Sequence, residues 1–307
     1  MSDDSKRGTP PDDAPSSSEG LEASRARSRP LLMLCAAMGV GGLVLAFGGL
    51  GSLFDQWDRR GIQAFGELPD GADYAAALAT FRGVLGASQI GKWIAAAFLT
   101  HHALSHGRAW ARRALIWGIV AFGLFEFLLA VVLGMTPGDA SGPLLVAIVG
   151  AIVLFRVPVG RSEPAASIAR PRAVAWLEGF AWLNVALGLA LVPALHSDLF
   201  AFYRGSMAST FFGETAIPSP LWPWLDYAYA GIGAAFAAHF ALLALATRAQ
   251  GFVPWVRVAW WTSVGAWFVL DSLGCSLHGA WFNIVQVNLP AFGGAVVLCL
   301  WAGRRSS

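Results

Sequence analysis

The sequence predicts an all-α, polytopic membrane protein with about eight transmembrane helices, arranged as two parallel four-helix repeats. Hydrophobic residues make up 56% of the 307 residues and charged residues only 13%, roughly half the usual share in soluble domains. The mean hydropathy is +0.57, and the apolar residues gather in runs of about 20, the length that crosses the hydrocarbon core of a bilayer. An internal similarity between the two halves of the chain predicts the repeats.

The apolar runs predict spans near 31–52, 82–104, 112–134, 142–158, 173–195, 226–247, 257–278 and 284–302. Residues 1–29 are rich in Ser, Pro, Asp and Arg, and such a segment buries too little apolar surface to fold. We therefore expect a disordered cytoplasmic tail at 1–29, a four-helix membrane repeat at 30–158, a cytoplasmic linker at 159–172 and a second membrane repeat at 173–303.

The orientation follows from the positions of arginine, because short cytoplasmic loops are enriched in Lys and Arg. Arginine clusters before the first predicted span, in every second connection and after the last span. These positions are Arg25, Arg27, Arg29, Arg108, Arg112, Arg113, Arg156, Arg161, Arg170, Arg172, Arg248, Arg257, Arg304 and Arg305. With an even number of spans, both termini are predicted to be cytoplasmic and the protein to lie in a bacterial inner membrane.

The two halves align at an offset of 145 to 147 positions. Phe65-Gly66-Glu67 matches Phe212-Gly213-Glu214, Gly86-Ala87 matches Gly233-Ala234, and Gly134 matches Gly279. Halves with an even number of spans point the same way, so a pseudo-two-fold axis along the membrane normal should relate them. Each half has one long outer connection, 53–81 and 196–225, which fits an interfacial or capping helix as well as a solvated loop.

The repeat also places ionisable residues at matching depths in the apolar spans. Lys92 matches His239, and Glu126 matches Asp271. A charge near the centre of a bilayer costs at least ~2.5–3.5 kcal/mol, and such residues are candidates for a functional site. We expect Lys92 to pair with Glu126 and His239 with Asp271. Either these pairs only hold helices together, or they contribute to a site for a polar ligand or a proton.

Further polar residues are expected at the outer end of the spans. Asp271, Cys275 and His278 share one helical face, because residues three and four apart are neighbours on a helix. With His196, His278 and the later Asn283, Asp271 could line a pocket that opens outward. No metal is predicted, since one helix cannot close a metal site alone. His196 and His278 could ligate haem if they face each other at one depth, but no cofactor is predicted.

The second half resembles small uncharacterised four-helix bacterial membrane proteins and is broadly similar to the DoxX-like group. The resemblance rests on Trp267-Phe268-Val269-Leu270-Asp271-Ser272, on His278-Gly279-Ala280-Trp281-Phe282-Asn283 and on Asn288. The first half departs from this pattern, with Glu126 as its acid and no counterpart of the His-Gly-Ala-Trp-Phe-Asn segment. The resemblance implies a four-helix unit, here doubled in tandem, and it assigns no catalytic residue.

The residues favour a membrane protein that binds or transports a small polar solute or a proton, with Asp271 and His239 as main contacts and Glu126 and Lys92 as their counterparts. One alternative is a non-catalytic scaffold whose charge pairs are structural. Another is a redox or lipid-modifying enzyme, although no motif specifies a reaction. The expected partners are the lipid bilayer and a small polar ligand, and nothing indicates nucleic acid.

Overall fold

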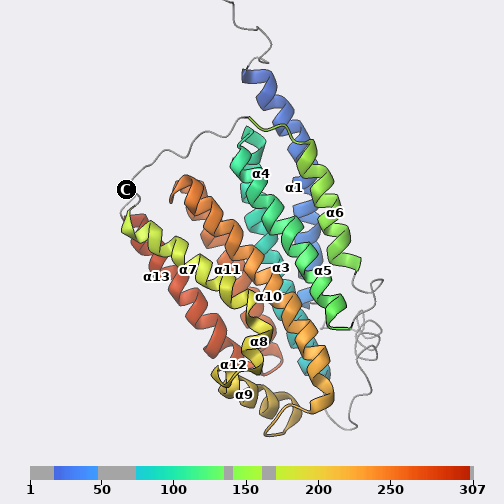
Figure 1. The fold of residues 1–307 in the computed structure, drawn as a ribbon. Coiled ribbons are helices and arrows are strands. Elements are labelled where there is room, and N and C mark those ends of the chain that lie inside the picture. The colour runs from blue at the N-terminus through green and yellow to red at the C-terminus, as the bar shows by residue number, and fades with distance from the viewer. Residues whose placement is uncertain (1–16, 48–73, 135–140, 161–170, 305–307) are drawn as a thin grey trace, which may run out of the picture.

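The computed structural model describes residues 17–47, 74–134, 141–160 and 171–304, and every regular element in these ranges is a helix. The all-α prediction is therefore confirmed for the described part of the chain. The helices run side by side, apart from a short capping segment at one end (Figure 1). The long helices are α1 (Ser17–Phe47), α3 (Tyr74–His102), α4 (Ala109–Leu115) continuing through η4 (Ile116–Ala121) into α5 (Phe122–Val132), α6 (Ser141–Arg156), α7 (Arg172–Leu189), α10 (Trp222–Gln250), α11 (Pro254–Leu277) and α13 (Leu289–Arg304).

Shorter elements connect these helices. They are η3 (Leu104–His106), α8 (Leu191–His196), η5 (Asp198–Phe200), α9 (Ala201–Phe212), η6 (Ser219–Leu221), α12 (Trp281–Asn283) and η7 (Ile284–Asn288). The N-terminal end of α1 and the C-terminal end of α13 lie toward the same end of the bundle, and α9 lies at the opposite end (Figure 1).

Four helical stretches among the described residues are long and apolar enough to cross a membrane. They are Gly20–Phe47, Ala109–Val132, Ser219–Gln250 and Trp281–Arg304, and Ser141–Arg156 is a shorter apolar helix. Large apolar side chains are exposed on the outer faces of the peripheral helices, for example Val40 on α1, Leu128 on α5, Phe155 on α6 and Val297 on α13. An exposed apolar surface of this extent is typical of contact with lipid rather than with water.

Helices α3 and α10 form the centre of the bundle, and most of the α10 side chains are buried. Helix α1 packs on α3, and α7 packs on α10. The third helices are exchanged between the halves, because α11 packs mainly on α3 while α4, η4 and α5 pack on α10. Helix α6 closes the first half against α1 and α5, and α13 closes the second half against α7 and α11.

Glycine pairs bring the backbones of neighbouring helices together at two places. A Cβ on Gly188 of α7 would lie 2.7 Å from the carbonyl oxygen of Gly233 on α10. A Cβ on Gly86 of α3 would lie 2.6 Å from the carbonyl oxygen of Gly42 on α1. Since no side chain fits there, close contact of small residues holds these helices, as is usual in lipid.

The first helix corrects the predicted tail. Residues 17–29, which we expected in a disordered segment, form the beginning of α1, while 1–16 lie outside the described residues. The helix is held by contacts that the composition did not reveal. Ser24 and Ser28 are buried, and Ser24 Oγ donates a hydrogen bond to the carbonyl oxygen of Pro158 at 3.0 Å. Part of the polar N-terminal segment is thus docked against the end of α6.

The second outer connection, 196–225, forms a cap rather than a solvated loop. Its helix α9 buries Tyr203, Met207 and Phe211 against residues of α3, α10 and α12. The ring of Phe81 on α3 lies 6.3 Å from that of Phe211, measured between centroids. Residues 53–73 of the first outer connection lie outside the described residues. The cap covers the end of the bundle next to the candidate site.

Candidate functional site

A cavity of about 440 Å³ lies between α3, α7, α10 and α11. The capping elements η5 and α9 and the segment from α12 to the start of α13 complete its wall. This size is within the range of small-molecule binding sites. Most of its wall is aromatic or aliphatic. The polar residues on the wall are Thr80, Ser88, Asn184, Tyr203, Tyr229, Asp271, Asn283 and Gln286. Among the residues that line it, Asp271 alone is acidic, and none is Lys, Arg or His.

Asp271 lies on α11 and is almost fully buried, with 1% of its surface exposed. One carboxyl oxygen, Oδ1, accepts hydrogen bonds from Asn288 Nδ2 at 2.8 Å, Asn283 Nδ2 at 3.1 Å and Cys275 Sγ at 3.2 Å. None of these three donors forms a hydrogen bond to the other carboxyl oxygen, Oδ2. The carboxyl group is therefore fixed through one oxygen, and the second remains for a different partner at the cavity wall.

The two asparagines reach Asp271 because the helix between them is widened. Asn283 and Asn288 are five residues apart, and residues 284–288 form the π-helix η7. A π-helix joins residues five apart, so both amides face the same way. Pro290 follows two residues after this π-helix and has no N–H to donate to the carbonyl of Gln286, so the regular α-helical hydrogen bonding is interrupted there. The Asn283 and Asn288 side chains also lie 3.4 Å apart.

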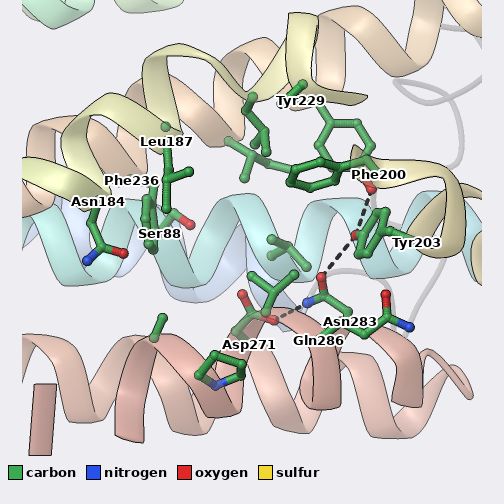
Figure 2. Close-up of a pocket in the computed structure, with 18 of the residues that line it drawn as sticks. Ser88, Asn184, Leu187, Phe200, Tyr203, Tyr229, Phe236, Asp271, Asn283 and Gln286 are labelled. Carbon is green, nitrogen blue, oxygen red and sulfur yellow. Dashed lines mark hydrogen bonds between the residues drawn. The ribbon is translucent and has the colours of Figure 1, made fainter. Parts of the chain in front are cut away.

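A chain of hydrogen bonds extends from Asp271 to the cap, as the dashed lines in Figure 2 show. Asn283 Oδ1 can only accept, so Tyr203 donates its hydroxyl proton to it at 3.0 Å. Tyr203 then accepts from Tyr229, whose hydroxyl oxygen lies 2.8 Å away. Every donor in this chain points toward Asp271. The chain fixes one wall of the cavity from α9 across to α11.

Two other polar groups on the cavity wall are buried without a hydrogen-bond partner. Ser88 Oγ on α3 and Trp267 Nε1 on α11 are both shielded from solvent. Trp267 Nε1 lies close to the Asp271 carboxyl group but does not reach normal hydrogen-bond geometry. A buried polar group without a partner costs about 1–3 kcal/mol. These groups would be satisfied by a ligand that brings its own donor and acceptor.

Lys92 and Glu126 do not line this cavity. They interact electrostatically with each other, but no hydrogen bond or ion pair joins these two described residues, so their direct pairing stays a prediction. Lys92 is buried on α3, with its Nζ 5.0 Å from the centroid of the Trp93 ring. The Glu126 carboxyl group lies against Gly231 of α10. The interaction therefore links α3 and α5, the two helices of the first half that pack on α10.

The expected pairing of His239 with Asp271 is wrong. The His239 ring is completely buried, and neither ring nitrogen has a hydrogen-bond partner. The ring packs instead against Gly91 of α3, where an added Cβ would lie 2.7 Å from it, and against the Phe240 ring at 5.0 Å between centroids. Similar depth in the sequence did not ensure contact, because α11 packs mainly on α3 rather than on α10.

We expect His239→Leu to leave the thermal stability of the protein unchanged or to raise it. The substitution removes two buried nitrogen atoms that have no hydrogen-bond partner, and polar atoms of this kind are costly to bury. It keeps an apolar group of similar size against Gly91. The melting temperature in detergent measures the effect. The larger His239→Phe is a control that should overfill the space beside Gly91 and lower the melting temperature. A clear loss of stability in His239→Leu would contradict the packing role.

His196 and His278 also lie away from the cavity wall. His196 Nε2 is 2.7 Å from Asp226 Oδ1, and its ring lies 4.6 Å from that of Trp222. His278 follows α11 and interacts electrostatically with Arg82. Within the described ranges, no group of three His, Cys, Asp or Glu side chains could hold a metal ion. Of the six residues singled out from the sequence, Asp271 is the one at the cavity.

Sequence reasoning missed Ser88, Trp267, Tyr203 and Tyr229 as parts of the site. Ser88 carries no motif. Trp267 belongs to the segment that resembles the DoxX-like group, and the resemblance gives it no role. Tyr203 lies in the outer connection 196–225, whose sequence fits a capping helix as well as a solvated loop. The sequence predicts Asn283 beside Asp271 in a pocket, and Asn283 donates a hydrogen bond to Asp271 and accepts one from Tyr203.

Comparisons with known proteins give no match for this chain among models of protein families, curated proteins or solved structures.

Proposed function

We propose that this chain is a multi-pass membrane protein that binds a small molecule in the cavity beside Asp271. The observation that carries the proposal is the unused Oδ2 of a buried, rigidly held carboxyl group on the wall of an otherwise mostly apolar cavity of about 440 Å³. Buried carboxyl groups are costly in an apolar surrounding. A ligand that donates a hydrogen bond to Oδ2 would offset part of that cost.

We propose eight membrane-crossing segments, adding α3, α6, α7 and α11 to those that are long and apolar enough alone. Their exposed faces support this: Ile152 on α6, Leu183 on α7 and Val269 on α11 are apolar and exposed. Helix α3 is less apolar because it is an inner helix, and many of its small and polar residues, such as Ser88, are buried against protein. A helix surrounded by other helices does not need an apolar surface.

We also propose that the chain is a tandem duplication of a four-helix unit of the DoxX-like kind. The close glycine pair Gly42–Gly86 recurs as Gly188–Gly233, at offsets of 146 and 147 positions. The left-handed glycines Gly134 and Gly279, 145 positions apart, each follow the third helix of their half. The helix contacts support the same relation, since α3 packs on α11 as α10 packs on α5.

The proposed orientation has both termini in the cytoplasm of a bacterial cell. The N-terminal end of α1 and the C-terminal end of α13 lie toward one end of the bundle, where α4, α7 and α11 begin (Figure 1). Arginines occur at or near these helix starts, at Arg108, Arg112, Arg172 and Arg257. Arginine concentrates in cytoplasmic loops. A reporter enzyme that works only in the cytoplasm should be active when fused after residue 307. Activity of a reporter restricted to the periplasm would reverse this orientation.

Binding of a solute fits the site better than relay of a proton. A relay needs groups that accept a proton on one side and release one on the other. Asn283 lies between Tyr203 and Asp271 in the hydrogen-bonded chain, and a side-chain amide has separate donor and acceptor atoms. His239, which the sequence offers as a base, makes no hydrogen bond to this network. The chain therefore positions Asp271 rather than delivering protons to it.

Native mass spectrometry of the protein released from mild detergent tests the ligand proposal. Asp271→Asn keeps an acceptor oxygen for Asn283 and Asn288 but replaces the cavity-facing oxygen by an amide. We expect a defined bound mass, other than bulk phospholipid, on the unaltered protein and its loss in Asp271→Asn. Asp226→Asn, at the ion pair outside the cavity, is the matched control and should keep it. Equal retention in both variants, or no bound mass at all, would contradict the proposal.

A further inference from the structure

The rim of the cavity reaches the side of the bundle, between α7 and the segment from η7 to α13. On α7, Leu183 and Leu187 line the cavity while 56% and 46% of their surfaces are exposed. On the opposite rim, Pro290 lines the cavity and is also exposed. Residues that face both the cavity and the outside mark its mouth. The mouth therefore opens sideways rather than along the bundle axis.

The surroundings of the mouth are apolar. Trp182 and Leu189 on α7 and Val285 and Leu289 beside the other rim are exposed. These residues belong to the same apolar outer surface as the faces assigned to lipid above. In the middle of α7, the Phe180 ring lines the cavity and packs against Gly294 of α13, where an added Cβ would lie 2.7 Å from the ring. Helices α7 and α13 are thus in contact on one side of the mouth. The apolar tail of a ligand can pass out of the cavity through the mouth itself.

The capping segment closes the other side of the mouth. Tyr203 and Phe211 of α9 are buried on the cavity wall. Leu199 of η5 and Phe202 of α9 also line the cavity, but they are exposed. Exposed aromatic and aliphatic residues beside a cap are typical of a membrane interface. A ligand would therefore enter from the bilayer through the mouth between α7 and α13, which α9 borders on one side.

The polar groups at the cavity limit the chemistry of the ligand's head. No cationic side chain lines the wall, and Asp271 supplies a carboxyl group, so a phosphate or carboxylate head would meet repulsion and find no counterion. Ser88 from α3 and Asp271 from α11 face the cavity in Figure 2. A hydroxyl group can donate to Asp271 Oδ2 and accept from Ser88 or from Trp267 Nε1, which a group that only accepts cannot do.

We propose that the cavity binds a single-chain amphiphile with a small uncharged hydroxyl head, which enters from the bilayer between α7 and α13. The head lies at Asp271, and the apolar tail passes Leu187 and Pro290 into the lipid. This inference rests on the proposed ligand site and specifies what occupies it. The volume of about 440 Å³ accommodates a head and the first part of a chain, whereas a two-chain phospholipid exceeds it.

Photolabelling of the full-length protein in lipid nanodiscs tests this inference. Three probes with a diazirine are compared: a long-chain alcohol, the carboxylic acid with the same chain, and a water-soluble alcohol without the chain. Mass spectrometry of the peptides locates each adduct. We expect the long-chain alcohol to label peptides that contain Leu187 or Pro290, and the acid to label them about tenfold less, as expected for loss of a hydrogen bond to a charged group.

Two substitutions on α13 distinguish a block of ligand entry from a general disturbance of the fold. Ala291→Trp adds bulk at the mouth and should reduce labelling by the long-chain alcohol about tenfold. Val297→Trp adds the same group on an exposed face of α13 away from the cavity and should leave labelling unchanged. Equal loss in both variants would overturn the lateral entry.

The probes also separate failure of this inference from failure of the ligand site. Equal labelling of the cavity peptides by acid and alcohol would overturn the assigned head group. If only the water-soluble alcohol labels them, the cavity binds a polar solute, so the ligand site stands and the amphiphile is excluded. If no probe labels these peptides, both the inference and the ligand site fail.

Discussion

Gly233→Ala is expected to lower the free energy of unfolding by about 3 kcal/mol, near the upper end of the usual cost of overfilling a packed core. A Cβ on Gly233 would overlap the backbone carbonyl of Gly188 and would lie 3.3 Å from Leu191. A backbone cannot turn aside as a flexible side chain can. Helices α7 and α10 would have to move apart along their contact, and the cavity between them would change shape.

The control for this prediction is Gly179→Ala on the same helix as Gly188. A Cβ at Gly179 would meet nothing within 4 Å, and alanine favours a helix more than glycine does. We expect no loss of stability there. Unfolding by increasing mole fraction of SDS, followed by fluorescence, compares the two variants. Similar stabilities would mean that α7 and α10 are not in the close contact that the structure shows.

Asp271→Leu is expected to lower the free energy of unfolding by about 2–4 kcal/mol. The substitution removes the acceptor of Asn283, Asn288 and Cys275 at once. Asn288 Nδ2 would keep only Ser272 Oγ, and Asn283 Nδ2 only the weaker acceptors Cys275 Sγ and Asn288 Oδ1. A buried donor that loses its best acceptor costs about 1–3 kcal/mol. The effect is larger than in Asp271→Asn, which keeps an acceptor oxygen in place. The order of stability should therefore be unaltered protein, then Asp271→Asn, then Asp271→Leu.

Asp226→Leu makes the same chemical change at a more open position. Asp226 pairs with His196, and 47% of the histidine side chain is exposed. Exposed ion pairs contribute about 0–1 kcal/mol, so we expect a small effect. The same SDS titration measures both substitutions. If Asp271→Leu were no more harmful than Asp226→Leu, the hydrogen bonds at Asp271 would not hold α11 and η7 together.

The positions of the helices could be predicted well from the sequence, because lengths of apolar runs report directly on helices in a bilayer. The expected run 257–278 corresponds to α11 at Pro254–Leu277, and 142–158 corresponds to α6 at Ser141–Arg156. The tail was predicted less well. Composition describes how much apolar surface a segment has, but not that Ser24 finds an acceptor at Pro158.

The site could be predicted only at Asp271, for a geometric reason. The predicted repeat gives the depth of a residue but not the neighbour that its helix faces. Depth alone pairs His239 with Asp271, whereas the His239 ring packs against Gly91. The hydrogen bonds of both Asn283 and Asn288 to Asp271 depend on a π-turn. A regular α-helix turns about 100° per residue and would place residues five apart on different faces. Periodicity alone therefore could not place both amides at one carboxyl group.

The exchange of third helices between the halves has a consequence for the order in which the protein is made. In the proposed membrane arrangement, the face of α3 that packs on α11 still lacks its partner when the first four helices have been inserted, and α5 lacks α10. Neither half can complete its own interior during synthesis. The core is therefore finished only when α10 and α11 arrive, and the two halves mature together as one unit instead of one after the other.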